Sequence, residues 1–310
     1  MRPLSSSDPL PDPMNNPYRG RFAPSPTGPL HIGSLIAAVG SFLEARRHDG
    51  AWLVRMEDLD PPREMPGAAE HILRTLEVYG FEWDGPVLYQ NARHPAYEAA
   101  LEILAQRGLL YPCACTRREI ADSALRGIEG RIYPGTCRNG LAPGKSARAW
   151  RVKVHDTVIA FDDAVQGHVS QNLTRDIGDF VLKRADGLFA YQLAVVVDDA
   201  MQGITHVVRG ADLLDSTPRQ IYLQRLLGLR TPHYAHLPVA ANARGEKLSK
   251  QTRAVPLDLS HPVPPLWQAL NFLGQRPPDD LTHASLTTLW QWARESWQLN
   301  AIAKIKSIML

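Results

Sequence analysis

Residues 18–50 constrain the fold most, because an extended pattern gives way to a helical one across a short turn rich in proline and glycine. The β-prone residues 18–23 predict a strand, and apolar positions between Leu35 and Leu43, three or four residues apart, predict a helix beginning near Leu30. A strand, a turn and a helix in this order form half of a βαβ unit, whose helix N-terminus attracts phosphate.

The start of this helix carries the sequence His31-Ile32-Gly33-Ser34. The imidazole of His31 can donate to phosphate oxygens, and Gly33 has no Cβ, so a base or a phosphate can approach the backbone. Taken alone, His31 is better explained as a histidine that caps the helix. The preceding residues 21–30 reverse that preference in favour of a nucleotide site.

A second motif, Lys-Leu-Ser-Lys at positions 247–250, lies in a polar stretch that predicts a surface loop. Such a composition usually indicates an ordinary solvated loop. A loop with two lysines, Lys247 and Lys250, can also close over a triphosphate and neutralise the charge that develops during transfer. The pairing of the two motifs in this order favours the second interpretation.

The rest of the chain alternates strand-like and helix-like segments. A predicted strand at 52–56 runs into Glu57, at the end of a strand where open α/β sheets bind ligands. From Tyr111 to about Ala149 the composition changes to cysteine, arginine and glycine without helical periodicity, which indicates an inserted module. Further strands are expected at 149–154, 158–161, 191–197 and 206–209, and helices at 66–79, 95–106, 216–228, 267–273 and 286–297.

The chain has three cysteines, Cys113, Cys115 and Cys137. An odd number in a cytosolic chain argues against a disulfide framework and towards a metal site or free thiols. Structural zinc takes about four ligands in a tetrahedron and prefers thiolates, so three cysteines need a fourth ligand. No histidine lies between Cys115 and Cys137 to supply it. Three free or buried thiols are the alternative.

Composition excludes several classes of protein. A net charge of +2 means that any nucleic-acid surface is local. There is no apolar run of about 18 residues, so no membrane span is expected. Residues 1–17 are rich in proline without an apolar core, so we expect a disordered leader rather than a signal peptide, and a cytoplasmic protein. Residues 140–146 resemble a P-loop, but they are one residue short and a predicted strand follows them.

Residues 21–34 and the motif at 247–250 together resemble the paired nucleotide-binding elements of class I aminoacyl-tRNA synthetases, and the first resembles the glutamyl branch. In that family the loop reads Lys-Met-Ser-Lys-Ser. Here Leu248 replaces the methionine and Gln251 the last serine, whereas both lysines are retained. Ser34 stands where the family usually has a second histidine, which changes part of the charge stabilisation.

The resemblance covers about residues 18–255, and 60 residues follow Lys250. Ordinary glutamyl-tRNA synthetases continue into a sizeable helical anticodon-binding region, for which there is no room. The chain therefore resembles their truncated paralogues, the glutamyl-Q tRNA(Asp) synthetase family. This resemblance implies a class I Rossmann-type α/β fold with a parallel sheet. The implied parts are a catalytic domain in two halves (18–110 and 179–255), a zinc-bearing insertion (111–178) and a C-terminal helical segment (256–310).

The resemblance also implies a set of site residues. A glutamate pocket needs arginines for two carboxylates and a carboxylate for the ammonium. The residues expected to bind glutamate are Arg21, Phe22, Ala23, Pro24, Ser25, Glu57 (for the α-ammonium), Tyr191 and Arg209. Catalysis is assigned to His31, Gly33, Lys247 and Lys250, and ATP binding to His31, Gly33, Ser34 and Lys250. One structural zinc ion is assigned to Cys113, Cys115, Tyr133 and Cys137, because a tyrosine completes the site in the truncated paralogues.

The implied activity is activation of L-glutamate with ATP and Mg²⁺, without tRNA, followed by transfer of glutamate to the queuosine base in the anticodon loop of tRNA(Asp). The expected partners are therefore L-glutamate, ATP and queuosine-containing tRNA(Asp), with no membrane, for a monomer. Three alternatives remain at this point: a truncated synthetase that charges a tRNA 3′ end, a non-catalytic tRNA-binding paralogue, and an enzyme that adenylates glutamate for a carrier protein.

Overall fold

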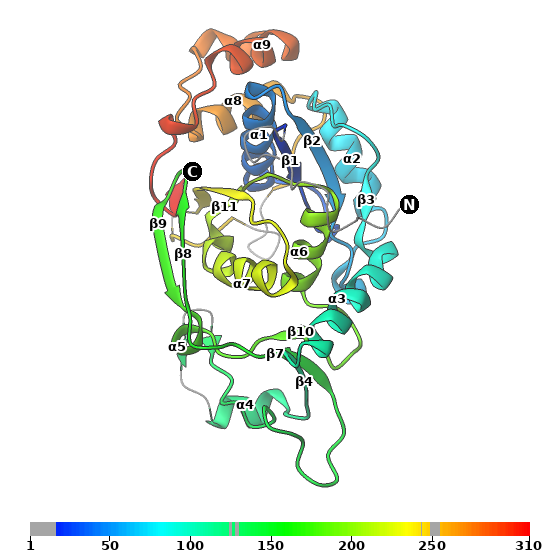
Figure 1. Cartoon of the computed structure of the whole chain (residues 1–310). Helices are drawn as coiled ribbons and strands as arrows, with labels where there is room; N and C mark the ends of the chain where they lie inside the picture. Colours follow the sequence, from blue (N-terminus) through cyan, green and yellow to red (C-terminus); the bar gives the residue numbers. More distant parts are fainter. Residues whose placement is uncertain (1–16, 124–125, 128–129, 243, 249–254) are drawn as a thin grey trace, which may run out of the picture.

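The computed structural model describes residues 17–123, 126–127, 130–242, 244–248 and 255–310. Most of the expected leader and Lys250 lie outside these residues. Figure 1 shows a central α/β body, with the C-terminal helices α8 and α9 at one end and the cysteine-containing module around β4 and α4 at the other.

The parallel sheet that the sequence predicted is present in two adjoining parts. In one part, β1 pairs in parallel with β2, and β2 with β3. In the other, β11 and β12 pair in parallel, and the antiparallel hairpin of β8 and β9 joins β12. The parts meet where the backbone N–H of Thr205 donates to the carbonyl of Arg19 at 2.9 Å. The strands are β1 (Arg19–Phe22), β2 (Ala51–Met56), β3 (Leu88–Tyr89), β8 (Val158–Asp163), β9 (Gly167–Asn172), β11 (His206–Gly210) and β12 (His233–Leu237).

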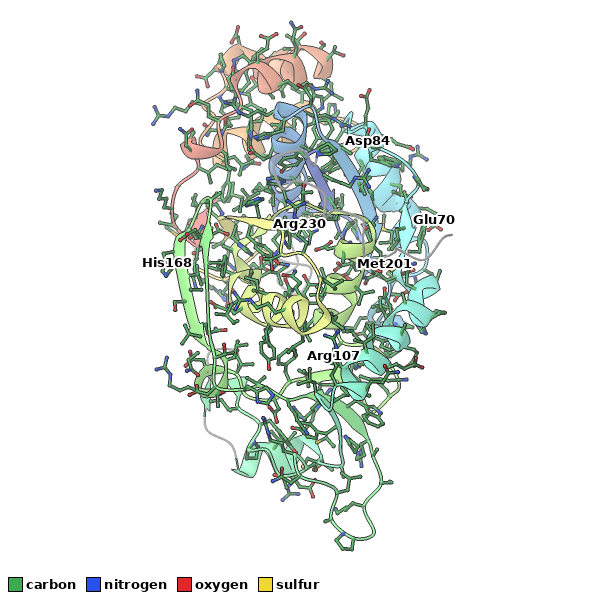
Figure 2. All side chains as sticks on the ribbon, in the orientation of Figure 1. Glu70, Asp84, Arg107, His168, Met201 and Arg230 are labelled. Atoms are coloured by element: carbon green, nitrogen blue, oxygen red, sulfur yellow. The ribbon has the colours of Figure 1, made fainter. Side chains whose placement is uncertain are left out.

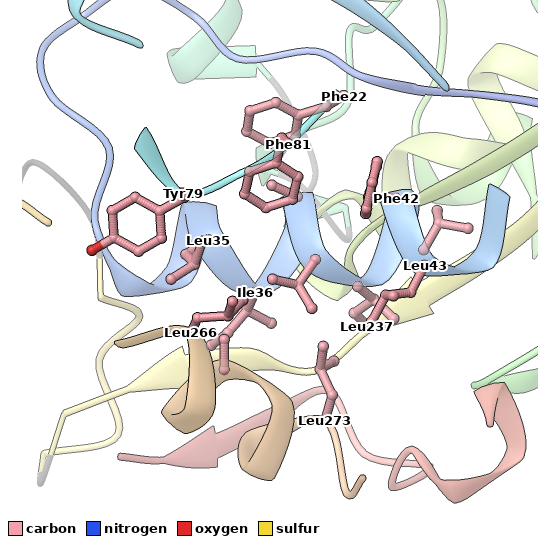
Figure 3. Packing of buried hydrophobic residues seen from close by; sticks show 14 of the residues in the cluster. Phe22, Leu35, Ile36, Phe42, Leu43, Tyr79, Phe81, Leu237, Leu266 and Leu273 are labelled. Atoms are coloured by element: carbon pink, nitrogen blue, oxygen red, sulfur yellow. The ribbon is translucent and has the colours of Figure 1, made fainter. Parts of the chain in front are cut away.

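Helix α1 (Ile32–Arg47) packs its apolar side chains against β12 on one side and α8 (Val263–Phe272) on another, as Figure 3 shows for the labelled Leu237 and Leu266. Gly40 makes this close approach possible, because a Cβ there would lie 2.5 Å from Cδ1 of Leu237. A glycine inside a helix costs about 1 kcal/mol relative to alanine. Packing against the sheet offsets that cost and fixes the start of α1 beside the strand ends.

Residues 191–197 were predicted as a strand, and this prediction is wrong. They form the first part of helix α6 (Tyr191–Met201), whose residues Leu193 to Asp199 are all buried. A helix buried on all sides shows no polar face, so its apolar run has the same pattern as that of a buried strand. The predicted helices elsewhere are confirmed as α2 (Ala68–Val78), α3 (His94–Gln106), α7 (Thr217–Leu227), α8 and α9 (Leu286–Ser296).

The module with the cysteines contains a small antiparallel sheet in which β7 lies between β4 and β10. It also contains a short helix, α4, which the sequence pattern did not predict. Its elements are β4 (Leu110–Cys113), α4 (Arg117–Ser123), β5 (Arg126–Gly127), β6 (Gly130–Arg131), β7 (Ala149–Val152), α5 (Leu173–Asp176) and β10 (Val181–Lys183). The division of the chain into domains remains a prediction.

The C-terminal segment returns to the catalytic body. Strand β14 (Ser307–Met309) pairs in parallel with β13 (Val239–Ala241), the strand that leads to the 247–250 motif. Short 3₁₀ helices complete the chain at Pro61–Arg63, Gln90–Arg93, Ala211–Ser216, Asp279–His283 and Leu299–Ala301. In the part of the chain that the structure describes, no helix has both the length and the apolar character that crossing a membrane requires.

Candidate functional site

Two adjoining cavities lie at the carboxyl ends of β1 and β11. The first has a volume of about 680 Å³, and the second has a volume of about 460 Å³. They share Phe22, Ser25, Ala37, Gly210, Asp212 and Lys247, so one opens beside the other. A compound site of this kind can hold two reactants side by side.

The first cavity joins the two motifs that lie far apart in the sequence. Of the predicted residues it is lined by Phe22, Pro24, Ser25, His31, Gly33, Ser34 and Lys247. His31 caps α1, and its Nδ1 accepts a hydrogen bond from the backbone N–H of Gly33 at 3.1 Å. In a neutral ring the proton is therefore on Nε2, which makes Nε2 a donor.

Gly33 lies against the second motif. A Cβ at Gly33 would lie 3.5 Å from the carbonyl oxygen of Leu248. The backbone N–H of Leu248 donates to Ala240 at 2.7 Å, which ties the motif to β13. Lys247 contacts Asp212, with Nζ 2.6 Å from Oδ2. The structure thus brings Gly33, Leu248 and Lys247 to one cavity, as the sequence predicted; Lys250 lies outside the described residues.

The second cavity collects the residues predicted to bind the amino acid. It is lined by Arg21, Phe22, Ala23, Ser25, Glu57, Tyr191, Arg209 and Lys247. Four cationic side chains line this cavity, those of Arg21, Arg63, Arg209 and Lys247, together with the carboxylates of Glu57 and Asp212. An excess of cations with carboxylates beside them matches an acidic amino acid with its ammonium. Burial, the largest effect, raises the pKa of Glu57, although Arg55 and Arg21 oppose it.

Arg209 is held from several sides at the end of β11. Its Nη2 donates to Thr217 Oγ1 at 2.9 Å and to Gln220 Oε1 at 2.7 Å. Its Nη1 lies 3.4 Å from the hydroxyl of Tyr191, at the start of α6. Although residues 191–197 form a helix and not the predicted strand, Tyr191 still lines the cavity, at the N-terminus of α6.

Two buried charged residues that the sequence interpretation left without a role, Asp199 and Arg55, contact the lining residues Arg21 and Glu57. Asp199 pairs bidentately with Arg21, at 3.1 and 3.3 Å, and also with Arg55, at 2.8 Å. Burial opposes the ionisation of Asp199, but the charges of Arg21 and Arg55 outweigh it and hold its pKa below the ordinary value. Arg55 is fully buried and lies 3.5 Å from Glu57. An arginine inside the apolar strand 51–56 was the signal that could have revealed this network.

The three cysteines lie together in the inserted module, and the hydroxyl of Tyr133 lies beside them. The hydroxyl of Tyr133 is 3.4 Å from the sulfur of Cys113 and 3.5 Å from that of Cys115. The sulfurs of Cys115 and Cys137 are 3.6 Å apart. For zinc bonds of about 2.3 Å to sulfur and 2.0 Å to oxygen, tetrahedral edges are roughly 3.5–3.8 Å. The four side chains therefore have the spacing of a metal site.

The comparisons with known proteins agree with this geometry. Residues 18–261 match the family model described as tRNA synthetases class I (E and Q), catalytic domain. A protein of Dechloromonas aromatica named glutamyl-Q tRNA(Asp) synthetase is 62% identical over 96% of this chain and 99% of its own length. The same name belongs to a protein of Aromatoleum aromaticum that is 61% identical over 91% of this chain and 90% of its own length.

The chain belongs to the glutamyl-Q tRNA(Asp) synthetase family.

Solved structures place this family within the class I synthetase fold. A glutamate tRNA ligase from Elizabethkingia meningosepticum, in complex with its amino acid, superposes with a TM-score of 0.76 at 25% identity. The match covers 95% of this chain and 67% of that one. A glutamate-tRNA synthetase from Elizabethkingia anophelis, 24% identical, has the same fold with a TM-score of 0.77 and covers 95% of this chain and 68% of that one. The predicted class I α/β fold is thus confirmed.

Proposed function

We propose that this member of the glutamyl-Q tRNA(Asp) synthetase family activates L-glutamate with ATP, without tRNA, and transfers it to the queuosine base of tRNA(Asp). The observation that supports this most is the sharing of lining residues by the two cavities. One cavity carries the helix start and the lysine motif, and the other carries arginines and Glu57. Adjoining sites for a nucleotide and an acidic amino acid are what adenylate formation requires.

In the first step, an oxygen of the glutamate α-carboxylate attacks the α-phosphorus of ATP, and the bond to the bridging oxygen of pyrophosphate breaks. A carboxylate is already ionised, so no general base is needed, and the work of the protein is alignment and charge stabilisation. Arg21 and Arg209 would hold the carboxylates of glutamate, and Glu57 the ammonium. Ser25, with Phe22, Ala23 and Pro24, would shape the wall between the reactants.

The phosphate groups would lie at the start of α1. His31 can donate from Nε2, because its Nδ1 accepts from Gly33, and Ser34 offers a hydroxyl where the family usually has a histidine. Lys247 and Lys250 would neutralise charge on the leaving pyrophosphate, together with Mg²⁺ bound to its oxygens. In the second step, a hydroxyl of the queuosine cyclopentenediol attacks the glutamyl carbonyl, an ester forms and AMP leaves.

We propose further that Cys113, Cys115, Tyr133 and Cys137 hold one structural zinc ion. Three of the distances among the four ligand atoms are 3.4–3.6 Å, and the three sulfurs all lie within 4.8 Å of one another, which supports this ligand set. All four positions of a tetrahedron would then be filled by protein, which leaves none for a reactive water. The monomeric state and the cytoplasmic location stay predictions.

The experiment that tests the proposal has two stages. Glutamate-dependent exchange between ATP and pyrophosphate is measured without tRNA, and labelled glutamate is then offered with queuosine-containing tRNA(Asp), unmodified tRNA(Asp) and tRNA(Glu). The proposal requires exchange and labelling of the queuosine-containing tRNA alone. Absence of exchange would favour a binding paralogue, labelling of tRNA(Glu) a truncated synthetase, and exchange without labelling of any tRNA a carrier-protein adenylating enzyme.

A further inference from the structure

Behind Arg209 lies a buried pair of side chains to which none of the roles above applies. His236 on β12 and Asp163 at the end of β8 have side chains that are both 0% exposed. Nδ1 of His236 is 2.6 Å from Oδ2 of Asp163, and Nε2 of the same ring accepts from Nε of Arg209 at 3.0 Å. The three side chains thus form a continuous chain that ends at the amino-acid cavity.

The sheet itself creates this alignment. The register of β11 and β12 places Arg209 directly opposite His236, and the backbone N–H of His236 donates to Oδ1 of Asp163 at 3.0 Å. Oδ1 also accepts from the backbone N–H groups of Val165, at 3.1 Å, and Gln166, at 2.9 Å. A carboxylate held by three backbone donors and one imidazole has little freedom to move.

The chemistry of the three groups allows one arrangement of protons. A guanidinium has only donors, so Nε2 of His236 must accept. A neutral imidazole then carries its proton on Nδ1, where the Asp163 carboxylate accepts it. Thr217 is compatible with this, because its hydroxyl lies 3.2 Å from the same Nε2 and can donate to it. Burial, the largest effect, lowers the pKa of His236 to about 4, although the hydrogen bond to Asp163 opposes it.

We propose that Asp163 and His236 are positioning residues for the amino-acid site: they fix the tautomer of the imidazole, and the imidazole fixes the plane of Arg209 so that its Nη1 meets a carboxylate of the bound amino acid. This inference rests on the proposed function, because it assumes that Arg209 binds glutamate. With Nε held by His236 and Nη2 by Thr217 and Gln220, the guanidinium cannot rotate about its axis. Pre-organised donors bind more tightly, since no order has to be imposed on binding.

Two substitutions at His236 separate positioning from mere support of the fold. In His236→Gln the side-chain carbonyl reaches the place of Nε2 and can still accept from Arg209, but the bond to Asp163 is lost. In His236→Asn the amide N–H reaches the place of Nδ1 and still serves Asp163, but Arg209 loses its acceptor. If His236 only supports the fold, His236→Asn should be the less damaging variant, because the buried carboxylate of Asp163 keeps its donor. If His236 positions Arg209, His236→Gln should keep the lower KM for glutamate.

Both variants are compared with the wild type by melting temperature and by the KM values for glutamate and ATP in pyrophosphate exchange. We expect His236→Asn to raise the KM for glutamate roughly tenfold or more, and His236→Gln only about threefold, because the first leaves the guanidinium without its acceptor. The KM for ATP should change less than about twofold in both variants, because the ATP cavity keeps its lining. Equal KM values for glutamate, or a ranking that follows the melting temperatures, would overturn the proposal.

Asp163→Asn tests the tautomer directly. The side-chain amide of this variant would donate to Nδ1, so the ring proton of His236 would move to Nε2. Two donors, Nε2 of His236 and Nε of Arg209, would then face each other, and the KM for glutamate should again rise about tenfold or more. The control is Asp162→Asn on the same strand, where the exposed carboxylate has Oδ1 2.9 Å from Nδ1 of His168. Figure 2 shows His168 on the hairpin of β8 and β9. This control should leave both KM values unchanged.

Nitrogen-15 NMR of the ring gives a measurement that does not depend on activity. The wild type should show His236 protonated on Nδ1 at pH 7, and a proton on Nε2 would overturn the inference. If the wild type shows no glutamate-dependent exchange, the proposed function fails. The tautomer of His236 still decides whether Asp163, His236 and Arg209 are hydrogen-bonded in the order described.

Discussion

The backbone N–H of Leu257 donates to the carbonyl of Leu30 at 3.0 Å. The neighbouring residues His31 and Pro256 form an antiparallel bridge, so the chain just after the lysine motif is pinned to the start of α1. On the other side, Leu248 is bound to β13 through Ala240. Leu248 and Leu257, the described residues before and after this part of the chain, are therefore both held by backbone hydrogen bonds beside the cavity that His31 lines.

The proposed function assigns Lys250, which lies outside the described residues, to the phosphate groups. Lys250→Ala should lower the rate of glutamate-dependent pyrophosphate exchange by about 100-fold or more, because a cation that neutralises the transition state is worth about 3 kcal/mol. The melting temperature should stay the same, since the sequence predicts that Lys250 lies in a polar surface loop. Exchange kinetics and thermal melting check this, with the exposed Lys304→Ala as control. Retained exchange would remove Lys250 from the mechanism.

Asp199 holds two buried arginines, so its loss should affect both stability and binding. Asp199→Asn should cost about 3–5 kcal/mol of unfolding free energy, since Arg21 and Arg55 keep buried charges without their partner. The KM for glutamate should rise as well, because Arg21 loses its orientation. Urea unfolding and exchange kinetics measure the two effects. Asp186→Asn, which breaks a largely exposed pair with Arg184, should cost less than about 1 kcal/mol. Equal losses in the two variants would contradict the argument.

The cysteine cluster predicts one zinc ion per chain. Elemental analysis should find it in the purified protein, and Cys137→Ser should lose it, because a thiolate ligand becomes a weak one. Tyr133→Phe should retain zinc more weakly, by about tenfold or more in affinity, since three thiolates remain. The control is Tyr111→Phe. The hydroxyl of Tyr111 donates to Oδ2 of Asp179 at 2.6 Å and not to a cysteine, so its loss should leave the zinc affinity unchanged. Full zinc affinity in Tyr133→Phe would exclude the phenol as a ligand.

The C-terminal strand should support ATP binding, because it pairs with β13. Deleting residues 307–310 exposes the edge of β13, the strand that holds Leu248 and lines the nucleotide cavity. We expect the KM for ATP to rise about tenfold with the fold retained, because an unpaired edge strand loses its register. Exchange kinetics and circular dichroism report on the two properties. Met309→Ser changes an exposed side chain but keeps the backbone pairing, and it should behave like the wild type. Normal kinetics in the deletion would show that β14 is dispensable.

Stability should fall as the pH is lowered below about 6.5. The ring of His206 stacks between those of Tyr18 and His233, with centroid distances of 4.1 and 4.8 Å. Burial is the largest effect on its pKa, and together with the charges of His233, His48 and Arg230 it lowers the pKa of His206 to about 4. The folded state thus disfavours the charged ring, and the unfolded chain binds more protons between about pH 4 and 6.5. This stability is present above that range and is lost as the pH falls.

Melting temperatures between pH 7.5 and 5 measure the effect. His206→Phe keeps a ring in the stack but cannot take up a proton, so its melting temperature should fall less steeply with pH than that of the wild type. Parallel curves for the two proteins would assign the pH dependence to other groups.

The sequence by itself determined the local elements and the family. The turn after β1, the start of α1 at His31 and the end of α7 at Gly228 follow from short-range patterns and from residues with restricted backbones. Such features depend on neighbours in the chain, which a single sequence displays. The motifs at 31–34 and 247–250 then predicted that the two segments would meet.

Only the tertiary structure decided the groups that hold the site in place. Helix α6 was predicted as a strand because burial on every side removes the polar face that distinguishes the two. The partnership of Asp199 with Arg21, and that of Asp163 with His236 and Arg209, depend on the register between strands and helices that lie far apart in the chain. A sequence shows which charged residues exist, but burial and pairing arise only when the chain has folded, because they depend on distances in space.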